Sequence, residues 1–179
     1  MITVVEYDPG WPAAFVAVRA IIAPAVAGLC RSIEHVGSTS VPGLAAKPII
    51  DIDVVVDSVE AVMPVVAALQ AIGYVHLGNL GIAGREALRL QLTPIAHNLY
   101  VCPAGSLGLR NHLAVRDHLR AHADTAAAYG QLKLDLASQV SDIDEYVEQK
   151  SALILAILQV EGFSSDELAE IEAANRQPG

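Results

Sequence analysis

A glycine–serine turn followed by a strand with two aspartates constrains this chain more than any other feature of its sequence. Gly37 and Ser38 come directly after Ile33 and Val36, whose spacing predicts a short strand. Glycine lets the backbone approach a ligand closely, and the amides that follow such a turn can donate to an anion. We therefore expect this turn to cradle a phosphate group.

The next strand separates its side chains into an apolar face and an acidic face. Asp51 and Asp53 share one face because side chains alternate along a strand. The other face carries Ile50, Ile52, Val54 and Val56. Neighbouring carboxylates repel each other unless a cation lies between them, and Mg²⁺ prefers oxygen ligands. The pattern predicts Asp51 and Asp53 as ligands of Mg²⁺, and the competing interpretation is an edge strand with one hydrated face.

A phosphate cradle and a metal-binding carboxylate pair lie here within twenty residues of each other. Both are required to bind a nucleoside triphosphate with its metal ion. The segment is similar to the Gly-Ser and Asp-x-Asp pattern of the nucleotidyltransferase superfamily. More specifically, residues 34–44 (EHVGSTSVPGL) and 46–52 (AKPIIDI) resemble the GrpB family of that superfamily.

The resemblance to the GrpB family extends from about residue 4 to residue 160. It includes residues 7–11 (YDPGW) near the N-terminus and residues 116–122 (RDHLRAH) in the second half. It implies an α+β domain with a mixed, mostly antiparallel sheet and a helical C-terminal half. The site is expected in the cleft between these halves, and the implied activity is nucleotidyl transfer to a small-molecule acceptor.

Periodicity and turn residues place the individual elements along the chain. Apolar residues recur at helical spacing after Pro12, and glycine ends a second helical pattern at Gly73. The expected strands are 74–77, 87–93 and 97–102, and the expected helices are 59–72, one opening at 107, 126–140 and 146–160. We expect one domain over residues 1–160 and an acidic tail or loose helix over 161–179.

Charge and cysteine content limit the partners and the compartment. The chain of 179 residues carries 11 basic and 20 acidic side chains, a net charge of −9, and no two basic residues are adjacent. Such a chain lacks the electrostatic footprint expected for duplex nucleic acid. The apolar stretch 13–29 contains Arg19 and Pro24 and is not expected to span a membrane. Cys30 and Cys102 lack metal-site spacing, which is typical of reduced thiols in the cytoplasm.

Several side chains are candidates to bind the nucleotide phosphates. Ser38 and Thr39 supply hydroxyls, and Lys47 lies close to the acidic strand. Arg116 and Arg120 share a helix face at i,i+4 spacing, and arginine suits bidentate phosphate contacts. The same spacing occurs in the pairs Tyr129/Lys133 and Tyr146/Lys150. These two lysines either bind phosphate or extend their alkyl chains over buried rings, and the sequence leaves both interpretations open.

The sequence lacks one group that superfamily enzymes generally use. Their third carboxylate lies on a later strand, but the corresponding segment 96–101 (AHNLYV) contains no acidic residue. His97 or Asn98 would then have to serve as base or metal contact. The alternative is a protein of the same fold that binds a ligand or a partner without catalysing transfer. The acceptor, the preferred nucleotide and the oligomeric state are not defined by the sequence.

Overall fold

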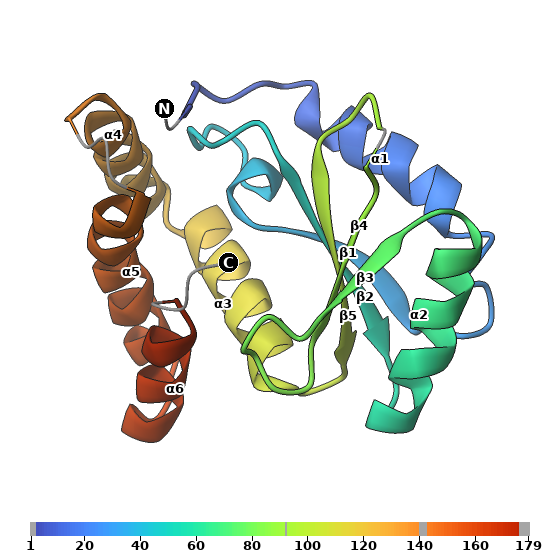
Figure 1. The fold of residues 1–179 in the computed structure, drawn as a ribbon. Coiled ribbons are helices and arrows are strands. Elements are labelled where there is room, and N and C mark those ends of the chain that lie inside the picture. The colour runs from blue at the N-terminus through green and yellow to red at the C-terminus, as the bar shows by residue number, and fades with distance from the viewer. Residues whose placement is uncertain (1–2, 92, 140–142, 176–179) are drawn as a thin grey trace.

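A five-stranded sheet forms the centre of the computed structural model, which describes residues 3–91, 93–139 and 143–175, with the side chains of 143–148 and 175 excluded (Figure 1). The strand order is β1-β2-β5-β4-β3, and only the β2–β5 pair is parallel. The strands are β1 (Ser32–Val36), β2 (Ile50–Val56), β3 (Val75–Gly78), β4 (Glu86–Arg89) and β5 (His97–Pro103). The expected mixed, mostly antiparallel sheet is confirmed.

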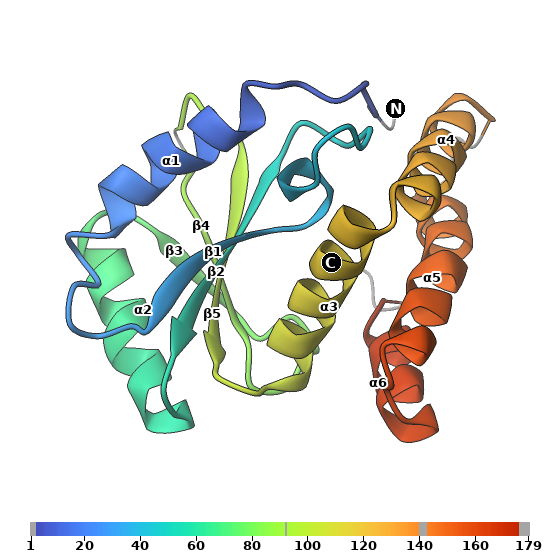
Figure 2. The same ribbon diagram turned by 180° about the vertical axis from the view of Figure 1, so that it is seen from behind.

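Helices cover both faces of this sheet. Helices α1 (Trp11–Ile22) and α2 (Val62–Ala71) pack on one face, and α3 (Leu107–Ala121) lies on the other (Figures 1 and 2). Beyond α3, the C-terminal half continues as α4 (Ala123–Gln139), α5 (Ile143–Val160) and α6 (Ser165–Asn175). Two short 3₁₀ turns, η1 (Ser38–Ser40) and η2 (Val59–Ala61), follow β1 and β2. None of the described helices is long and apolar enough to cross a membrane.

The two faces of strand β2 point to the hydrophobic core and to the candidate site. Ile50, Ile52 and Val54 are at most 2% exposed and join α1 and α2 in the main hydrophobic core. The alternating residues Asp51 and Asp53 therefore face α3 and the helical half. Because β2 pairs with β1 on one side and β5 on the other, it is an inner strand. The interpretation of a hydrated edge strand is wrong.

Element positions differ from the sequence expectations mainly at their ends. Strand β4 ends at Arg89 rather than near residue 93, and α4 begins at Ala123, three residues early. After residue 160 the chain forms α6, whose Ile171 packs with Leu158 and Phe163 in a separate cluster. This helix is docked on α5 rather than loose. Residue 140, the expected end of α4, lies outside the described residues.

Candidate functional site

The two aspartates of β2 lie in different surroundings. Asp53 is completely buried, and its Oδ2 lies 2.8 Å from Nδ1 of His112 on α3, so the imidazole N–H donates to the carboxylate. Its other oxygen, Oδ1, has no hydrogen-bond partner among the described residues. Asp51 is partly exposed, and its Oδ1 accepts a hydrogen bond of 2.8 Å from the side-chain amide of Asn98 on β5. Oδ1 of Asp53 is therefore a buried acceptor that none of the described residues uses.

Burial and charged neighbours act in opposite directions on the pKa of Asp51 and on the pKa of His112. Burial raises the pKa of Asp51, and the hydrogen bond from Asn98 and the nearby His112 offset only part of that rise. Burial alone lowers the pKa of His112, but the charge and hydrogen bond of Asp53 outweigh it, so the net pKa of His112 is raised. Asp53 thus favours the protonated form of His112, while burial disfavours the charged form of Asp51.

Gly37 lies directly over Asp51. Its backbone has φ 69° and ψ −175°, a region open in practice only to glycine. A Cβ atom at this position would lie 2.3 Å from Oδ2 of Asp51. The glycine is therefore required by its conformation and by the aspartate beneath it, whatever ligand the turn receives.

The turn after Gly37 is held in place by contacts within the protein. The hydroxyl of Ser40 donates to the carbonyl oxygen of Gly37 over 2.6 Å. The guanidinium of Arg120 donates to the Ser40 carbonyl oxygen through two nitrogens, at 3.0 and 2.8 Å. Thr39 is buried, and its hydroxyl lies 3.0 Å from Nε2 of His35 and donates weakly to the Ile49 carbonyl. The turn is pre-formed, and Arg120 and Thr39 contribute to its shape.

Arg116 is also engaged by protein groups. Its guanidinium donates to Glu34 at 3.0 Å, to Asp117 at 2.7 Å and to the His35 carbonyl at 3.2 Å. The two arginines expected to bind phosphate therefore brace β1 and the turn against α3. Phosphate binding by the two arginines stays a prediction, and in the structure their guanidinium groups donate to protein groups.

A basic cavity of about 220 Å³ opens on the other side of Asp51. Its walls include Ser38, Thr39, Lys47, Asp51, Asn98, Lys133 and Lys150. Lys133 is only 2% exposed, and its ammonium donates to the Ser38 hydroxyl at 2.8 Å and lies 4.4 Å from the centre of the Tyr129 ring. Lys133 therefore lies over a buried ring, as one interpretation predicted, and phosphate binding by this lysine stays a prediction. The side chain of Tyr146 lies outside the described residues.

Burial and neighbouring ammonium groups lower the pKa values of Lys133 and Lys150. Burial and the nearby Lys150 lower the pKa of Lys133 to about 7. Burial and Lys47 lower the pKa of Lys150, against the attraction of Asp51. The ammonium groups of Lys47, Lys133 and Lys150 concentrate positive charge around this one cavity. The cavity is therefore electrostatically suited to a polyanion.

A second cavity, also of about 220 Å³, continues from the first toward α3. It shares Ser38, Asp51 and Lys150 with the basic cavity. Its remaining walls come from the turn and the helical half: Gly37, Asn111, His112, Val115, Arg116, Leu119, Tyr129 and Ile154. The expected cleft between the sheet and the helices is present, and Asp51 lies where its two parts meet.

One predicted catalytic residue lies elsewhere. His97 pairs with Ile50 in the β2–β5 register and therefore faces α2 and the core rather than the cleft. Its Nδ1 donates to the Ile95 carbonyl at 2.7 Å, and its Nε2 lies 2.8 Å from the Tyr74 hydroxyl. Adjacent strand residues point to opposite faces, so His97 and Asn98 cannot both reach the site. The assignment of His97 as a base is wrong.

Asn98 does lie at the site, directly beside Asp51. The two residues are partners in the parallel β2–β5 register. Asn98 donates its amide hydrogen to Asp51, and a neutral amide does not take up a proton at ordinary pH. Its geometry therefore indicates orientation of Asp51 rather than base catalysis.

Sequence reasoning missed the residues that surround Asp53. His112 is its hydrogen-bond partner, and Tyr100 is its neighbour on β5. Arg85 is buried with its guanidinium 4.4 Å from the Tyr100 ring centre, and its Nε has no partner among the described residues. One local signal was present for His112, because it precedes Arg116 by four residues and so shares its helix face.

Most of the chain matches a known protein family. A model of the GrpB family, described as GrpB protein, matches residues 1–160 of this chain. This chain belongs to the GrpB family. The resemblance predicted from residues 34–52 and 116–122 is confirmed, and the matched range ends before α6.

Relatives and a solved structure agree with the family assignment. The chain is 40% identical over 124 residues to UPF0157 protein YqkA of Bacillus subtilis, which covers 69% of this chain but only 36% of that protein. It is 39% identical over 155 residues to UPF0157 protein SCO7215 of Streptomyces coelicolor, covering 85% and 80% of the two chains. The crystal structure of conserved protein GrpB from Enterococcus faecalis matches with a TM-score of 0.76 at 35% identity, over 94% of this chain and 99% of that one. These names state no reaction.

Proposed function

We propose that this GrpB-family protein binds a nucleoside triphosphate with Mg²⁺ and transfers the nucleotidyl group to a small-molecule acceptor. The observation that carries the proposal is the basic cavity that ends at Asp51, beside a buried Asp53 with an unpartnered oxygen. Cations for a triphosphate and carboxylates for its metal ion thus lie next to each other.

In this proposal the basic cavity receives the β- and γ-phosphates. Lys133 already donates to Ser38, so a phosphate oxygen near the serine hydroxyl would gain both donors. Lys47 and Lys150 line the same cavity and supply two further charges. Hydrogen bonds from ammonium to phosphate are charge-assisted and stronger than neutral ones. Arg116 and Arg120 enter the proposal as residues that hold the turn in position rather than as phosphate ligands.

The two aspartates fit the demands of Mg²⁺. Among the described residues no three His, Cys, Asp or Glu side chains form a metal cluster. Mg²⁺ does not require one, because it is usually bound by one or two carboxylates together with water and substrate phosphates. The unpartnered Oδ1 of Asp53 and the carboxylate of Asp51, which lines both cavities, are the acceptors that would hold it. When bound, the ion would neutralise charge that develops on the phosphates.

Transfer would replace the bond between the α-phosphorus and the bridging oxygen by a bond from phosphorus to the acceptor's oxygen or nitrogen. The acceptor oxygen or nitrogen forms a bond to the α-phosphorus, the bond from that phosphorus to the bridging oxygen breaks, and pyrophosphate leaves with the electron pair. The acceptor's proton passes to water. The protein's contribution is positioning and charge, which account for most catalysis in phosphoryl transfer. The second cavity, with apolar walls from Val115, Leu119 and Ile154, is the place for the nucleoside.

A second candidate function is nucleotide binding without transfer. The specific observation that favours it is Asn98, which occupies the position beside Asp51 where a third carboxylate would act as base. A positioned general base typically contributes about 10²- to 10⁴-fold to a rate. A protein without one would still bind Mg²⁺ and nucleotide, and the cavities would serve as a sensor or partner site.

Pyrophosphate release separates these functions. The wild type is incubated with Mg²⁺, each of ATP, GTP, CTP and UTP, and a panel of small alcohols, amines and phosphates. Transfer predicts acceptor-dependent release that is lost in Asp51→Asn and retained in Arg31→Gln, a control that removes an exposed cation paired with Asp57. Nucleotide binding without release supports the second candidate. Release that persists in Asp51→Asn contradicts the assigned site.

A further inference from the structure

Ser38 and Lys133 form a close pair of a hydroxyl and an amine. Nζ of Lys133 lies 2.8 Å from Oγ of Ser38, although the two residues are 95 positions apart in the sequence. Lys133 is 2% exposed, and the centre of the buried Tyr129 ring lies 4.4 Å from its Nζ. The amine is therefore shielded from bulk water and in direct contact with one hydroxyl group.

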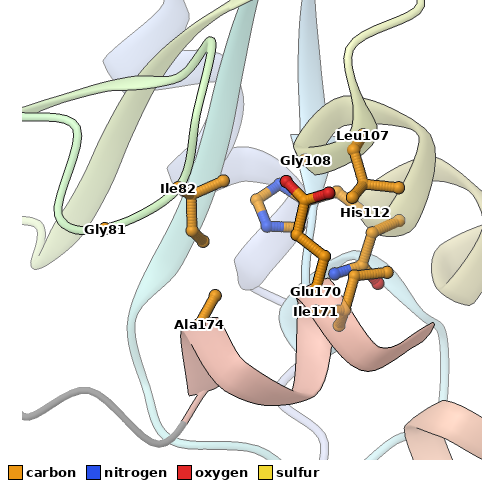
Figure 3. Close-up of a pocket in the computed structure, with 9 residues that line it drawn as sticks. Gly81, Ile82, Leu107, Gly108, His112, Glu170, Ile171 and Ala174 are labelled. Atoms are coloured by element: carbon orange, nitrogen blue, oxygen red, sulfur yellow. The ribbon is translucent and has the colours of Figure 1, made fainter. Parts of the chain in front are cut away.

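Ser38 lies where the two larger cavities meet. It is partly exposed and lines both the basic cavity and the second cavity, each of about 220 Å³. Figure 3 shows a third hollow, next to His112, of only about 30 Å³, and none of the described residues that line it is a serine, cysteine or lysine. The serine is thus accessible from two spaces that each have room for several water-sized groups, whereas its amine partner is buried.

We infer that Ser38 is a nucleophile activated by Lys133, and that it takes the acyl group from an ester with an anionic group on its acyl side. This activity goes beyond the proposed nucleotidyl transfer and does not depend on it. A serine hydroxyl is a weak nucleophile until an adjacent base removes its proton, and lysine is one of the residues that serve as this base. The base must lie within hydrogen-bond reach of the hydroxyl, as Lys133 does.

Lys133 can act as a base only in its neutral form. Burial and the nearby Lys150 lower its pKa from 10.5 to about 7, against the attraction of Asp51, and Lys47 lines the same cavity. A substantial fraction of Lys133 is therefore neutral at neutral pH. The neutral amine nitrogen accepts the hydrogen bond from the Ser38 hydroxyl, which is the direction that proton transfer requires.

The reaction transfers an acyl group to water through a serine ester. Oγ of Ser38 forms a bond to the carbonyl carbon, while its proton passes to Nζ of Lys133. The bond from that carbon to the leaving oxygen then breaks, and Nζ returns the proton to this oxygen as the alcohol departs. Water attacks the serine ester with Lys133 again as the base, which releases the carboxylic acid and restores Ser38. Water is the only co-reactant.

The walls of the two cavities define which ester fits. Lys47 and Lys150 line the basic cavity, so this cavity attracts an anionic group on the acyl side. The same positive charge stabilises the oxyanion that forms when Oγ adds to the carbonyl carbon. The second cavity has apolar walls from Val115, Leu119 and Ile154, which suit an apolar leaving group.

Labelling with a fluorophosphonate tests the nucleophile in EDTA, without nucleotide or Mg²⁺. This reagent bonds covalently to activated serine hydroxyls, and peptide mass spectrometry locates the modified residue. We expect the label on Ser38. The labelling rate should rise with pH and level off once Lys133 has lost its proton, above its pKa of about 7. A label on another serine instead of Ser38, or a rate that rises without levelling off, would overturn the inference.

Two variants separate the basicity of Lys133 from its charge. Lys133→Met removes both, whereas Lys133→Arg keeps the positive charge on a group that does not give up its proton. A general base typically contributes about 10²- to 10⁴-fold, so both variants should label at least about 100-fold more slowly. Ser138→Ala removes an exposed serine from the same helix and should label like the wild type. A wild-type labelling rate in either Lys133 variant would refute its role as the base.

Two esters of equal acyl length test the substrate class. p-Nitrophenyl hydrogen adipate carries a terminal carboxylate, and p-nitrophenyl hexanoate ends in a methyl group. Release of p-nitrophenol should show a kcat/KM about tenfold higher for the adipate ester, the usual effect of one hydrogen bond to a charged group. Ser38→Ala should lose the release of both. A preference for the hexanoate ester, or turnover that persists in Ser38→Ala, would contradict the assignment.

The ester and nucleotide assays can fail independently. Nucleotide binding without a label on Ser38 and without Ser38-dependent ester hydrolysis would refute the nucleophile and leave the proposed function standing. A label on Ser38 in a protein that binds no nucleotide would refute the proposed function and leave Ser38 as the site of acyl transfer.

Discussion

Replacing Lys133 by methionine should stabilise the free protein and at the same time remove nucleotide binding. The folded protein lowers the pKa of this ammonium from 10.5 to about 7, chiefly through burial. At about 1.36 kcal/mol for each pH unit, the penalty for keeping the charge is on the order of 5 kcal/mol. The variant also loses the Ser38 hydrogen bond and the Tyr129 contact, and each loss lowers its stability by about 1 kcal/mol. We therefore expect Lys133→Met to gain about 2–3 kcal/mol below pH 7.

The stability advantage of Lys133→Met over the wild type should decrease as the pH rises. An unfolded chain keeps this proton until about pH 10.5, whereas the folded protein releases it near pH 7. Between these values the unfolded state binds more protons, so wild-type stability rises with pH. The advantage of Lys133→Met should be complete below pH 7 and disappear by about pH 10.5.

Urea unfolding followed by fluorescence of Trp11, the only tryptophan, measures this effect at pH 6.5 and pH 10. Leu136→Ala on the same helix is the control, because removing its buried side chain should cost about 2–5 kcal/mol equally at both pH values. A Lys133→Met variant that is destabilised to the same extent at both pH values would refute the argument. A gain in stability accompanied by unchanged nucleotide affinity would refute the role of Lys133 in phosphate binding.

Three further substitutions probe the centre of the site. Gly37→Ala should cost about 1–3 kcal/mol for its glycine-only backbone and displace Asp51, so urea stability and nucleotide affinity should both fall; a silent variant would show that the turn relaxes freely. His112→Ala should cost about 3–5 kcal/mol because it leaves Asp53 buried without its donor, and a loss below 1 kcal/mol would contradict that pairing. Asn98→Asp adds a third carboxylate beside Asp51, so Mg²⁺ should raise its melting temperature more than that of the wild type; equal Mg²⁺ responses would count against a metal at this site.

The parts of the site that follow from local sequence were predictable. Alternation along β2 correctly separated Asp51 and Asp53 from the apolar face, and the Gly37 turn followed from the residue type. The same alternation rule, applied to His97 and Asn98, would have removed His97 from the list of catalytic residues.

Contacts between distant segments could not be derived in this way. Asp53 and its partner His112 are 59 residues apart, and their meeting depends on how α3 docks on the sheet. Arg120 was expected to bind phosphate because of its chemistry, yet it donates to a backbone carbonyl 80 residues away. Spacing identifies which side chains share a helix face, but tertiary packing decides which groups occupy their donors.

Calorimetric titration of nucleotide with and without Mg²⁺ tests the central claim most directly. The wild type and the double variant Asp51→Asn/Asp53→Asn are titrated with ATP, GTP, CTP and UTP. We predict that at least one nucleotide binds the wild type in a Mg²⁺-dependent manner. The double variant should lose this binding, and its free form is expected to fold but to be less stable than the wild type, because Asp53→Asn removes the buried charge beside His112. Absence of binding by all four nucleotides at millimolar concentration, or equal Mg²⁺-dependent affinity in the double variant, would contradict the account.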